Sequence, residues 1–180
     1  YLIDLYDLED ERREVSLSWG FNGKSFNRGS KGNRPWFGPK FWDLTANRTA
    51  SEKNLYFLRY ADVIMILAEA ANELGNTDEA VTYVNMIRRR AKADMLEMGG
   101  KLNQSQMREV IMEERAREFV GEFQRKWDLS RWDKLVDAVR SISQDNVDGA
   151  KNVQPHHVLF PIPYDEIVKN RNLTQNSGYN

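Results

Sequence analysis

Apolar residues recur at helical spacing from Leu55 to Leu74 and give this segment a broad hydrophobic face, and Gly75 follows it as a typical stop signal. A second periodic segment begins after a cap at Asn76 or Thr77. It ends near Lys92 in a basic run, which suits the negative end of a helix dipole. The two segments therefore predict a pair of antiparallel helices.

Small residues mark the expected crossing of these two helices. Ala68 and Ala71 in the first helix, with Ala80 and Ile87 in the second, give a pattern that resembles a tetratricopeptide unit. Ala71 stands where that pattern usually has an aromatic residue, and one clear unit is visible, so the match is partial. We expect a mainly α-helical protein built from tetratricopeptide-like antiparallel helical hairpins, with long loops and an extended C-terminal tail.

Two more helices are predicted downstream. Asn103 with Gln106 is a capping-box variant that opens the first of them. Gly121 predicts a break or kink, because glycine weakens a helix interior, and a further helix is expected from about Lys126 to Val139. The core face of the helix that follows the capping box is expected to consist of Met107, Val110, Ile111 and Phe119.

The two ends of the chain lack helical periodicity. Glu14 to Trp19 alternates polar and apolar residues and predicts a strand, with a turn at Asn22-Gly23. Residues 141–157 are polar and predict a surface loop, and Phe160 to Pro163 predicts extended chain followed by at most a short helical turn. We expect a loop-rich segment with short strands at 1–54, a helical core at 55–140 and a loop with an extended tail at 141–180, all within one domain.

Composition excludes several classes of function. The 180 residues include 26 basic and 27 acidic ones, so the net charge of -1 favours neither nucleic acid nor an anionic membrane. Cysteine is absent, which removes disulfides and thiolate metal sites. No apolar run approaches the roughly 20 residues that span a bilayer. The start reads as mid-chain sequence without a targeting signal, so we expect a fragment of a longer protein.

The segment 114–132 combines charge with aromatic residues. Phe119, Phe123 and Trp127 recur every four residues and are expected to stack along one helix face, which brings charges close to the core. Buried charges need partners, so we expect the pairs Glu113–Arg117, Arg125–Asp128 and Asp128–Arg131. We interpret the charged residues as a structural ion network; its members are Glu114, Arg115, Glu118, Arg125, Asp128 and Arg131.

A catalytic role for this segment is the alternative. Glu114 and Glu118 have the i, i+4 spacing that would suit a retaining glycosidase pair, but both project from one side beside arginines, so we expect no catalysis. His156 and His157 are adjacent, and in an extended segment their rings point opposite ways. We therefore expect no metal site and no cofactor.

Three separated motifs carry a family resemblance: LRYADVIMILAEAANELG from Leu58, ERAREFVGEFQRKWDLSRW from Glu114 and LFPIPYDEIVKNRNLTQNSGY from Leu159. In order and spacing they resemble the C-terminal half of the SusD/RagB family of outer-membrane glycan-binding lipoproteins. Asp10 to Arg13 and Lys40 to Asp43 resemble segments that precede the first motif in that family.

The resemblance implies a non-catalytic protein that binds an oligosaccharide or another small nutrient and passes it to a TonB-dependent transporter. It also implies attachment to the outer leaflet of the outer membrane through a lipidated N-terminal cysteine, which this chain does not include. A tetratricopeptide-like peptide-binding adaptor is the alternative function, and a glycoside hydrolase is a third.

Sugar contacts are expected in the loop-rich segment. Aromatic faces and planar polar groups suit pyranose rings and their hydroxyls, and the candidates are Trp19, Asn22, Asn33, Arg34, Trp36 and Phe37. The alternative is that these aromatics fill the core between loops and helices. Trp127 and Trp132 are instead expected in the core, as cation–π partners of Arg125 or Arg131.

Overall fold

The computed structural model describes residues 5–18, 20–21, 24–25, 36–43, 46, 51–143 and 146–179, with only the backbone at 20–21, 24–25 and 36. The chain divides into two compact units, Tyr1–Arg125 and Lys126–Asn180, which are described separately. The described residues are mainly helical, as the sequence predicts.

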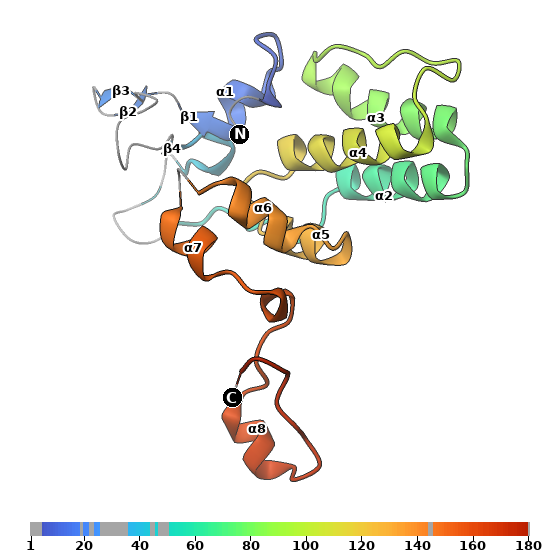
Figure 1. Ribbon diagram of the computed structural model, residues 1–180. Helices are drawn as coiled ribbons and strands as arrows, with labels where there is room; N and C mark the ends of the chain where they lie inside the picture. The colour runs from blue at the N-terminus through green and yellow to red at the C-terminus, as the bar shows by residue number, and fades with distance from the viewer. Residues whose placement is uncertain are drawn as a thin grey trace. The chain divides into compact units, whose positions relative to one another are not determined.

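Three long helices enclose the main core of the first unit: α2 (Tyr60–Glu73), α3 (Thr77–Ala91) and α4 (Gln104–Glu118) (Figure 1). The antiparallel pair α2 and α3 is confirmed, although α2 begins at Tyr60 rather than near Leu55. Small and flexible side chains from all three helices fill their shared core. Its fully enclosed members are Met65, Ala68, Ala80, Val84 and Met107.

The ends of these helices follow the predicted signals. Gly75 adopts φ +87° after α2, and its N–H donates to the Asn72 carbonyl at 3.0 Å. The predicted capping box is present, because the Asn103 side chain accepts from the Gln106 N–H while the Gln106 side chain accepts from the Asn103 N–H. Such a box satisfies donors that a helix start leaves unpaired.

The loop-rich segment holds a short helix, α1 (Arg12–Ser16), four two-residue strands and the 3-10 turn η2 (Pro39–Phe41). The antiparallel strand pairs are β1 (Leu17–Ser18) with β4 (Trp36–Phe37), and β2 (Gly20–Phe21) with β3 (Lys24–Ser25). The predicted strand from Glu14 is thus wrong up to Ser16, and Trp19, Asn22 and Gly23 lie outside the described residues.

A side chain explains why this strand prediction fails. The Asp10 carboxylate accepts hydrogen bonds from the Arg12 backbone N–H at 2.9 Å and from its guanidinium Nε at 2.9 Å. An aspartate bonded in this way favours a turn or a helix start over a strand. The local bond therefore overrides the polar–apolar alternation that follows it.

The chain turns sharply after α4, as the glycine predicts. Gly121 has φ +73° and Phe123 has φ +62°. Because the helix ends before these residues, the predicted stack of aromatics is wrong: Phe119 is buried, Phe123 is 80% exposed and Trp127 is 58% exposed.

The second unit contains short helices. They are α5 (Arg125–Arg131, which begins at the last residue of the first unit), α6 (Leu135–Ser141), α7 (Val147–Asn152), the 3-10 turn η3 (Pro155–Val158) and α8 (Tyr164–Lys169). The single helix predicted from Lys126 to Val139 is wrong. Asp133 takes a positive φ of 56° between α5 and α6, and the Lys134 N–H closes the turn on the Leu129 carbonyl at 2.8 Å.

The predicted surface loop at 141–157 is also wrong in part, because α7 and η3 fall within it. The Asn146 side chain accepts from the Gly149 N–H at 3.0 Å and caps α7. In η3 the rings of His156 and His157 lie 4.2 Å apart by centroid, so the expectation that they point opposite ways is wrong. A 3-10 turn, unlike a strand, does not place neighbouring side chains on opposite faces.

Side chains near the C-terminus hold the tail in shape. Gln175 accepts from the Ile162 N–H and donates to the Ile162 carbonyl, both at 2.8 Å, as a neighbouring strand would. Asn176 donates to the Phe160 carbonyl at 2.7 Å, and the Tyr179 hydroxyl donates to the Leu159 carbonyl at 2.7 Å. The extended course at Phe160 to Pro163 and the short helix after it match the prediction.

Candidate functional site

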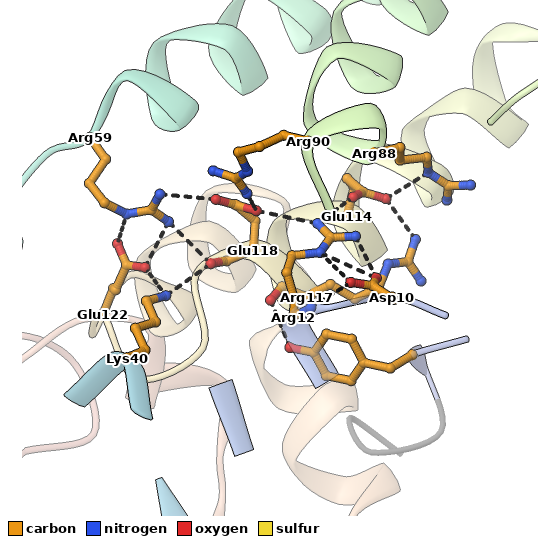
Figure 2. Close-up of polar contacts among 11 residues, drawn as sticks. Asp10, Arg12, Lys40, Arg59, Arg88, Arg90, Glu114, Arg117, Glu118 and Glu122 are labelled. Carbon is orange, nitrogen blue, oxygen red and sulfur yellow. Dashed lines mark hydrogen bonds and ion pairs between the residues drawn. The ribbon is translucent and has the colours of Figure 1, made fainter. Parts of the chain in front are cut away.

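Three glutamates lie four residues apart at the end of α4 and just beyond it, and Figure 2 shows them among basic side chains from distant segments. We call Glu114, Glu118 and Glu122 the glutamate row. Their exposed fractions are 0%, 3% and 6%. Buried carboxylates are costly unless paired, so the row requires partners.

Glu114 pairs with three arginines. Its carboxylate accepts from Arg12 of α1 at 2.6 Å, from Arg88 of α3 at 2.9 Å and from Arg117 one turn further along α4 at 2.9 Å. Burial favours the protonated acid, but these three cations outweigh it and hold the pKa of Glu114 below its ordinary value. Glu114 therefore joins α1, α3 and α4 as a buried anion.

Glu118 repeats this arrangement one turn later. It accepts from Arg90 at 2.5 Å, pairs with Arg59 at 3.0 Å and shares Arg12 at 3.3 Å. Burial again raises the pKa, but the hydrogen bond and charge of Arg90, followed by the charges of Arg59 and Arg12, lower it below the ordinary value. Arg12 thereby bridges two members of the row. Its Nη2 atom also pairs with the carboxylate of Asp10 at 2.7 Å.

Glu122 lies beyond the helix and forms ion pairs with Arg59 and Lys40. Arg59, which precedes α2, donates Nε and Nη2 to its two oxygens, each at 2.8 Å, in the fork geometry that arginine favours. Lys40 of η2 donates to the same carboxylate and, at 3.2 Å, to the Glu118 carbonyl. Burial lowers the pKa of Lys40, although Glu122 acts against this effect.

Tyr6 closes the network on the side of α1. Its hydroxyl donates to the Arg117 carbonyl at 2.7 Å, and burial raises its pKa to about 12. Its ring packs with Leu17 and Val120 in a small second core. The row thus ties the loop-rich segment to the three-helix group through both charge and apolar contact.

Arginines also flank Phe119, the C-cap residue of α4. The guanidinium carbons of Arg115 and Arg59 lie 4.9 Å and 5.2 Å from its ring centroid, within cation–π range. Arg115 further donates to Asp62 of α2 at 2.7 Å and to Gln124 at 3.1 Å. These contacts fix the side chains at the helix break.

Two of the predicted short-range pairs are confirmed. Glu113 and Arg117 lie 3.7 Å apart, and Asp128 and Arg131 lie 3.0 Å apart, so both pairs form. Arg125 donates to the Met112 carbonyl at 2.9 Å. Arg131 also stacks on the half-buried Trp132 at 4.4 Å, in agreement with the expected cation–π contact, whereas the expectation of a core position for Trp127 is wrong.

Sequence spacing missed the main cations of the row. Arg12, Lys40, Arg59, Arg88 and Arg90 come from other elements, up to 106 residues from their carboxylates. The family resemblance gives the one signal for three of them: Arg12 lies in Asp10 to Arg13, Lys40 begins Lys40 to Asp43, and Arg59 lies in the motif from Leu58.

The electrostatics of the row do not suit acid catalysis. A glycosidase needs one carboxyl group whose pKa is raised, so that it can donate a proton near neutral pH. The pKa values of Glu114 and Glu118 are both lowered. Among the described residues, no group of three or more carboxylate or histidine side chains is arranged to hold a metal ion.

Of the predicted sugar-contacting residues, Trp19, Asn22, Asn33 and Arg34 lie outside the described residues, as does the side chain of Trp36. Phe37 is described, and the residue is 56% exposed. It meets Phe41 at a centroid distance of 5.0 Å, and both rings lie against Gly121, where a Cβ would approach Phe41 within 2.6 Å. Phe37 is therefore held at the surface by the helix break.

No helix in the described part of the chain is long and apolar enough to cross a membrane.

Comparisons with known proteins extend these observations. SusD-like protein P25 of Formosa agariphila is 36% identical over 148 residues, which are 78% of this chain and 28% of that protein. The starch-binding protein SusD of Bacteroides thetaiotaomicron is 28% identical over 74% of this chain and 23% of its own length. The chain thus spans about a quarter of each of these relatives.

A solved SusD superfamily protein from Bacteroides vulgatus superposes with a TM-score of 0.76 at 26% identity, and the match covers 99% of this chain and 43% of that one. The model of the SusD family matches residues 8–179. The family match therefore includes the glutamate row, the helices that bury it and the tail held by Gln175. The chain belongs to the SusD family.

Proposed function

We propose that this chain is the helical part of a glycan-binding protein that serves nutrient uptake at the bacterial outer membrane and does not catalyse a reaction. The observation that carries the proposal is the family match over residues 8–179, together with a relative that is named for binding starch. The lowered pKa values of Glu114 and Glu118 agree with a structural role for these two carboxylates.

Within this chain, the loop-rich segment is the proposed place of sugar contact. Phe37 is the candidate whose side chain is described; it is exposed, and it packs against Phe41 and Gly121. An exposed aromatic ring suits the apolar face of a pyranose. Trp19, Asn22, Asn33, Arg34 and Trp36 belong to the same proposal.

Isothermal titration of the intact protein against a panel of oligosaccharides tests this function. We expect one glycan class to bind, and Phe37→Ala to weaken its binding while leaving the thermal midpoint unchanged. Tyr164→Ala removes another exposed aromatic, far along the sequence, and serves as the control. If no oligosaccharide binds and a peptide panel does, the chain functions as a tetratricopeptide-like adaptor instead.

The proposed partner is a TonB-dependent transporter, and the proposed anchor is a lipid attached to an upstream cysteine. Both rest on family membership. Co-purification of the intact, lipidated protein with a transporter from outer-membrane extracts tests the partnership. If the protein is recovered without any transporter under conditions that preserve such complexes, the proposal fails.

A further inference from the structure

Residues 36–43 include Phe37, and we call them the Phe37 segment. Regular structure in this segment is limited to the two-residue strand β4 (Trp36–Phe37) and the 3-10 turn η2 (Pro39–Phe41). Elements this short are not stable by themselves. The position of Phe37 therefore depends on contacts between its segment and the rest of the first unit.

The first half of the Phe37 segment packs against the short helix α1. The Gly38 N–H donates to the Ser16 carbonyl at 3.0 Å. The two backbones approach closely, because a Cβ at Gly38 would collide with the Val15 carbonyl. This contact fixes the backbone next to Phe37 and leaves the second half of the segment to other partners.

Lys40 joins the second half of the segment to the chain just after α4. Its ammonium pairs with the Glu122 carboxylate and donates to the Glu118 carbonyl at 3.2 Å (Figure 2). The side chains of Lys40 and Glu122 are 14% and 1% exposed, so the ion pair is nearly enclosed. A buried charge is costly without its partner, so the position of Lys40 is tied to that of Glu122.

The rings of the segment meet the same stretch of chain. The Lys40 Nζ lies 5.4 Å from the ring centroid of Phe41, the next residue. Phe41 in turn meets Phe37 at 5.0 Å, and both rings lie against Gly121, which precedes Glu122. The ion pair and the ring contacts therefore hold the same two parts of the chain together.

Glu122 does not depend on Lys40 alone for its pairing. Arg59 donates Nε and Nη2 to its two oxygens, each at 2.8 Å, and Arg59 precedes α2 rather than belonging to the Phe37 segment. Removal of the Lys40 ammonium therefore leaves the carboxylate paired, whereas it detaches η2 from the end of α4. Lys40 thus acts on the Phe37 segment more than on the three-helix core.

We propose that Lys40 is a positioning residue of the sugar site: its ion pair with Glu122 holds the Phe37 ring in place before the sugar binds, and Lys40 itself does not contact the sugar. A side chain that is already ordered binds at a lower cost in conformational entropy than one that must be ordered on binding. The inference rests on the proposed function, because Phe37 contacts a sugar only under that proposal.

A binding cycle on Phe37 and Lys40 in the intact protein tests this role. Phe37→Ala, Lys40→Met and the double variant are titrated with the oligosaccharide of the panel that binds the unchanged protein most tightly. We expect Lys40→Met to raise the Kd about fivefold, the size expected for ordering one side chain, and the double variant to bind no more weakly than Phe37→Ala. Lys101→Met removes a lysine that pairs with Glu97 at the surface, and this matched control should leave the Kd unchanged.

Hydrogen exchange supplies a readout that needs no ligand. The Phe41 N–H donates to the Gly38 carbonyl at 3.0 Å, and the Trp42 N–H donates to the Pro39 carbonyl at 3.1 Å. We expect both amides to exchange at least about fivefold faster in Lys40→Met, while the amides of α4 keep their rates. If the affinity falls but both amides exchange as before, Lys40 does not act by holding the segment, and the proposal is overturned.

The remaining outcomes distinguish a failure of this role from a failure of the proposed function. If no oligosaccharide binds the unchanged protein, or if Phe37→Ala binds as tightly as it does, the proposed sugar site fails and the role of Lys40 fails with it. If Phe37→Ala weakens binding but Lys40→Met does not, or if the two losses multiply in the double variant, only the role of Lys40 fails. If Lys40→Met does not fold, Lys40→Gln replaces it with the same expectations, because it also removes the charge.

Discussion

Arg12 and Glu114 are 102 residues apart in sequence, yet their side chains meet at 2.6 Å with exposed fractions of 8% and 0%. This ion pair connects the short helix α1 with the long helix α4. Because Arg12 also reaches Glu118 and Asp10, it is the residue that links the carboxylates on the two sides of the network.

Replacement of Arg12 by methionine should therefore be strongly destabilising. The substitution leaves Asp10 without its guanidinium partner and removes one of the cations of Glu114. We expect the free energy of unfolding to fall by about 3–5 kcal/mol, the range for breaking a buried ion pair from one side. Urea unfolding followed by circular dichroism measures this loss.

Arg108→Met is the matched control for that experiment. Arg108 also forms an ion pair, with Glu73 at 2.6 Å, but both side chains are almost half exposed. Exposed pairs contribute little, so the urea midpoint should barely change. Equal losses for Arg12→Met and Arg108→Met would contradict the distinction between a buried and a surface pair.

The glutamate row should make stability sensitive to acid. The pKa of Glu118 is lower in the folded protein than in the unfolded chain, where it is about 4.3. Its stabilising contribution is therefore complete above about pH 4.3 and is lost as the pH falls through the folded-state value. Thermal midpoints measured from pH 7 to pH 3 should fall less steeply for Glu118→Gln than for the unchanged protein, and parallel curves would refute this.

The turn at Gly121 should not tolerate a side chain. Gly121→Ala incurs the strain of a positive φ, about 1–2 kcal/mol, and forces Phe41 to move because the new Cβ would lie 2.6 Å from its ring. Gly75→Ala also has a positive φ but meets no atom within 4 Å, so it isolates the strain. We expect a larger loss of unfolding free energy for Gly121→Ala than for Gly75→Ala, and the reverse order would count against the packing of Phe41 there.

The tail should loosen when Gln175 is removed. Gln175→Ala deletes both hydrogen bonds to Ile162, and we expect faster hydrogen exchange at the Ile162 amide with little change elsewhere. Asn172→Ala removes an exposed amide from the same segment and is the control. Unchanged exchange at Ile162 in Gln175→Ala would show that other contacts hold the tail.

The sequence predicts those parts of this fold that depend on neighbours along the chain. The capping box at Asn103 and the break at Gly121 follow from residues a few positions apart. The expectation that Glu114 and Glu118 lie close to the core is confirmed, although the aromatic stack from which it followed is wrong. Spacing within one helix could not supply Arg12 or Arg59 as their partners, because tertiary folding brings these side chains together.

The failed predictions have local causes that compete with periodicity. At Arg12 a side-chain bond to Asp10 starts a helix that continues to Ser16, into the segment from Glu14 where alternation favoured a strand. At Asp133 a left-handed turn divides a helix that composition favoured as continuous. Aspartate tolerates that conformation better than most residues, so its position is informative only in retrospect.

The central claim is that the glutamate row is a structural anchor between the loop-rich segment and the helices. A double-mutant cycle on Arg12 and Glu114 tests it most directly, with urea unfolding of Arg12→Met, Glu114→Gln and the double variant. We predict that the double variant is more stable than the sum of the single losses implies, by a coupling energy of about 1–3 kcal/mol. Strictly additive losses, or single losses near zero, would contradict the claim.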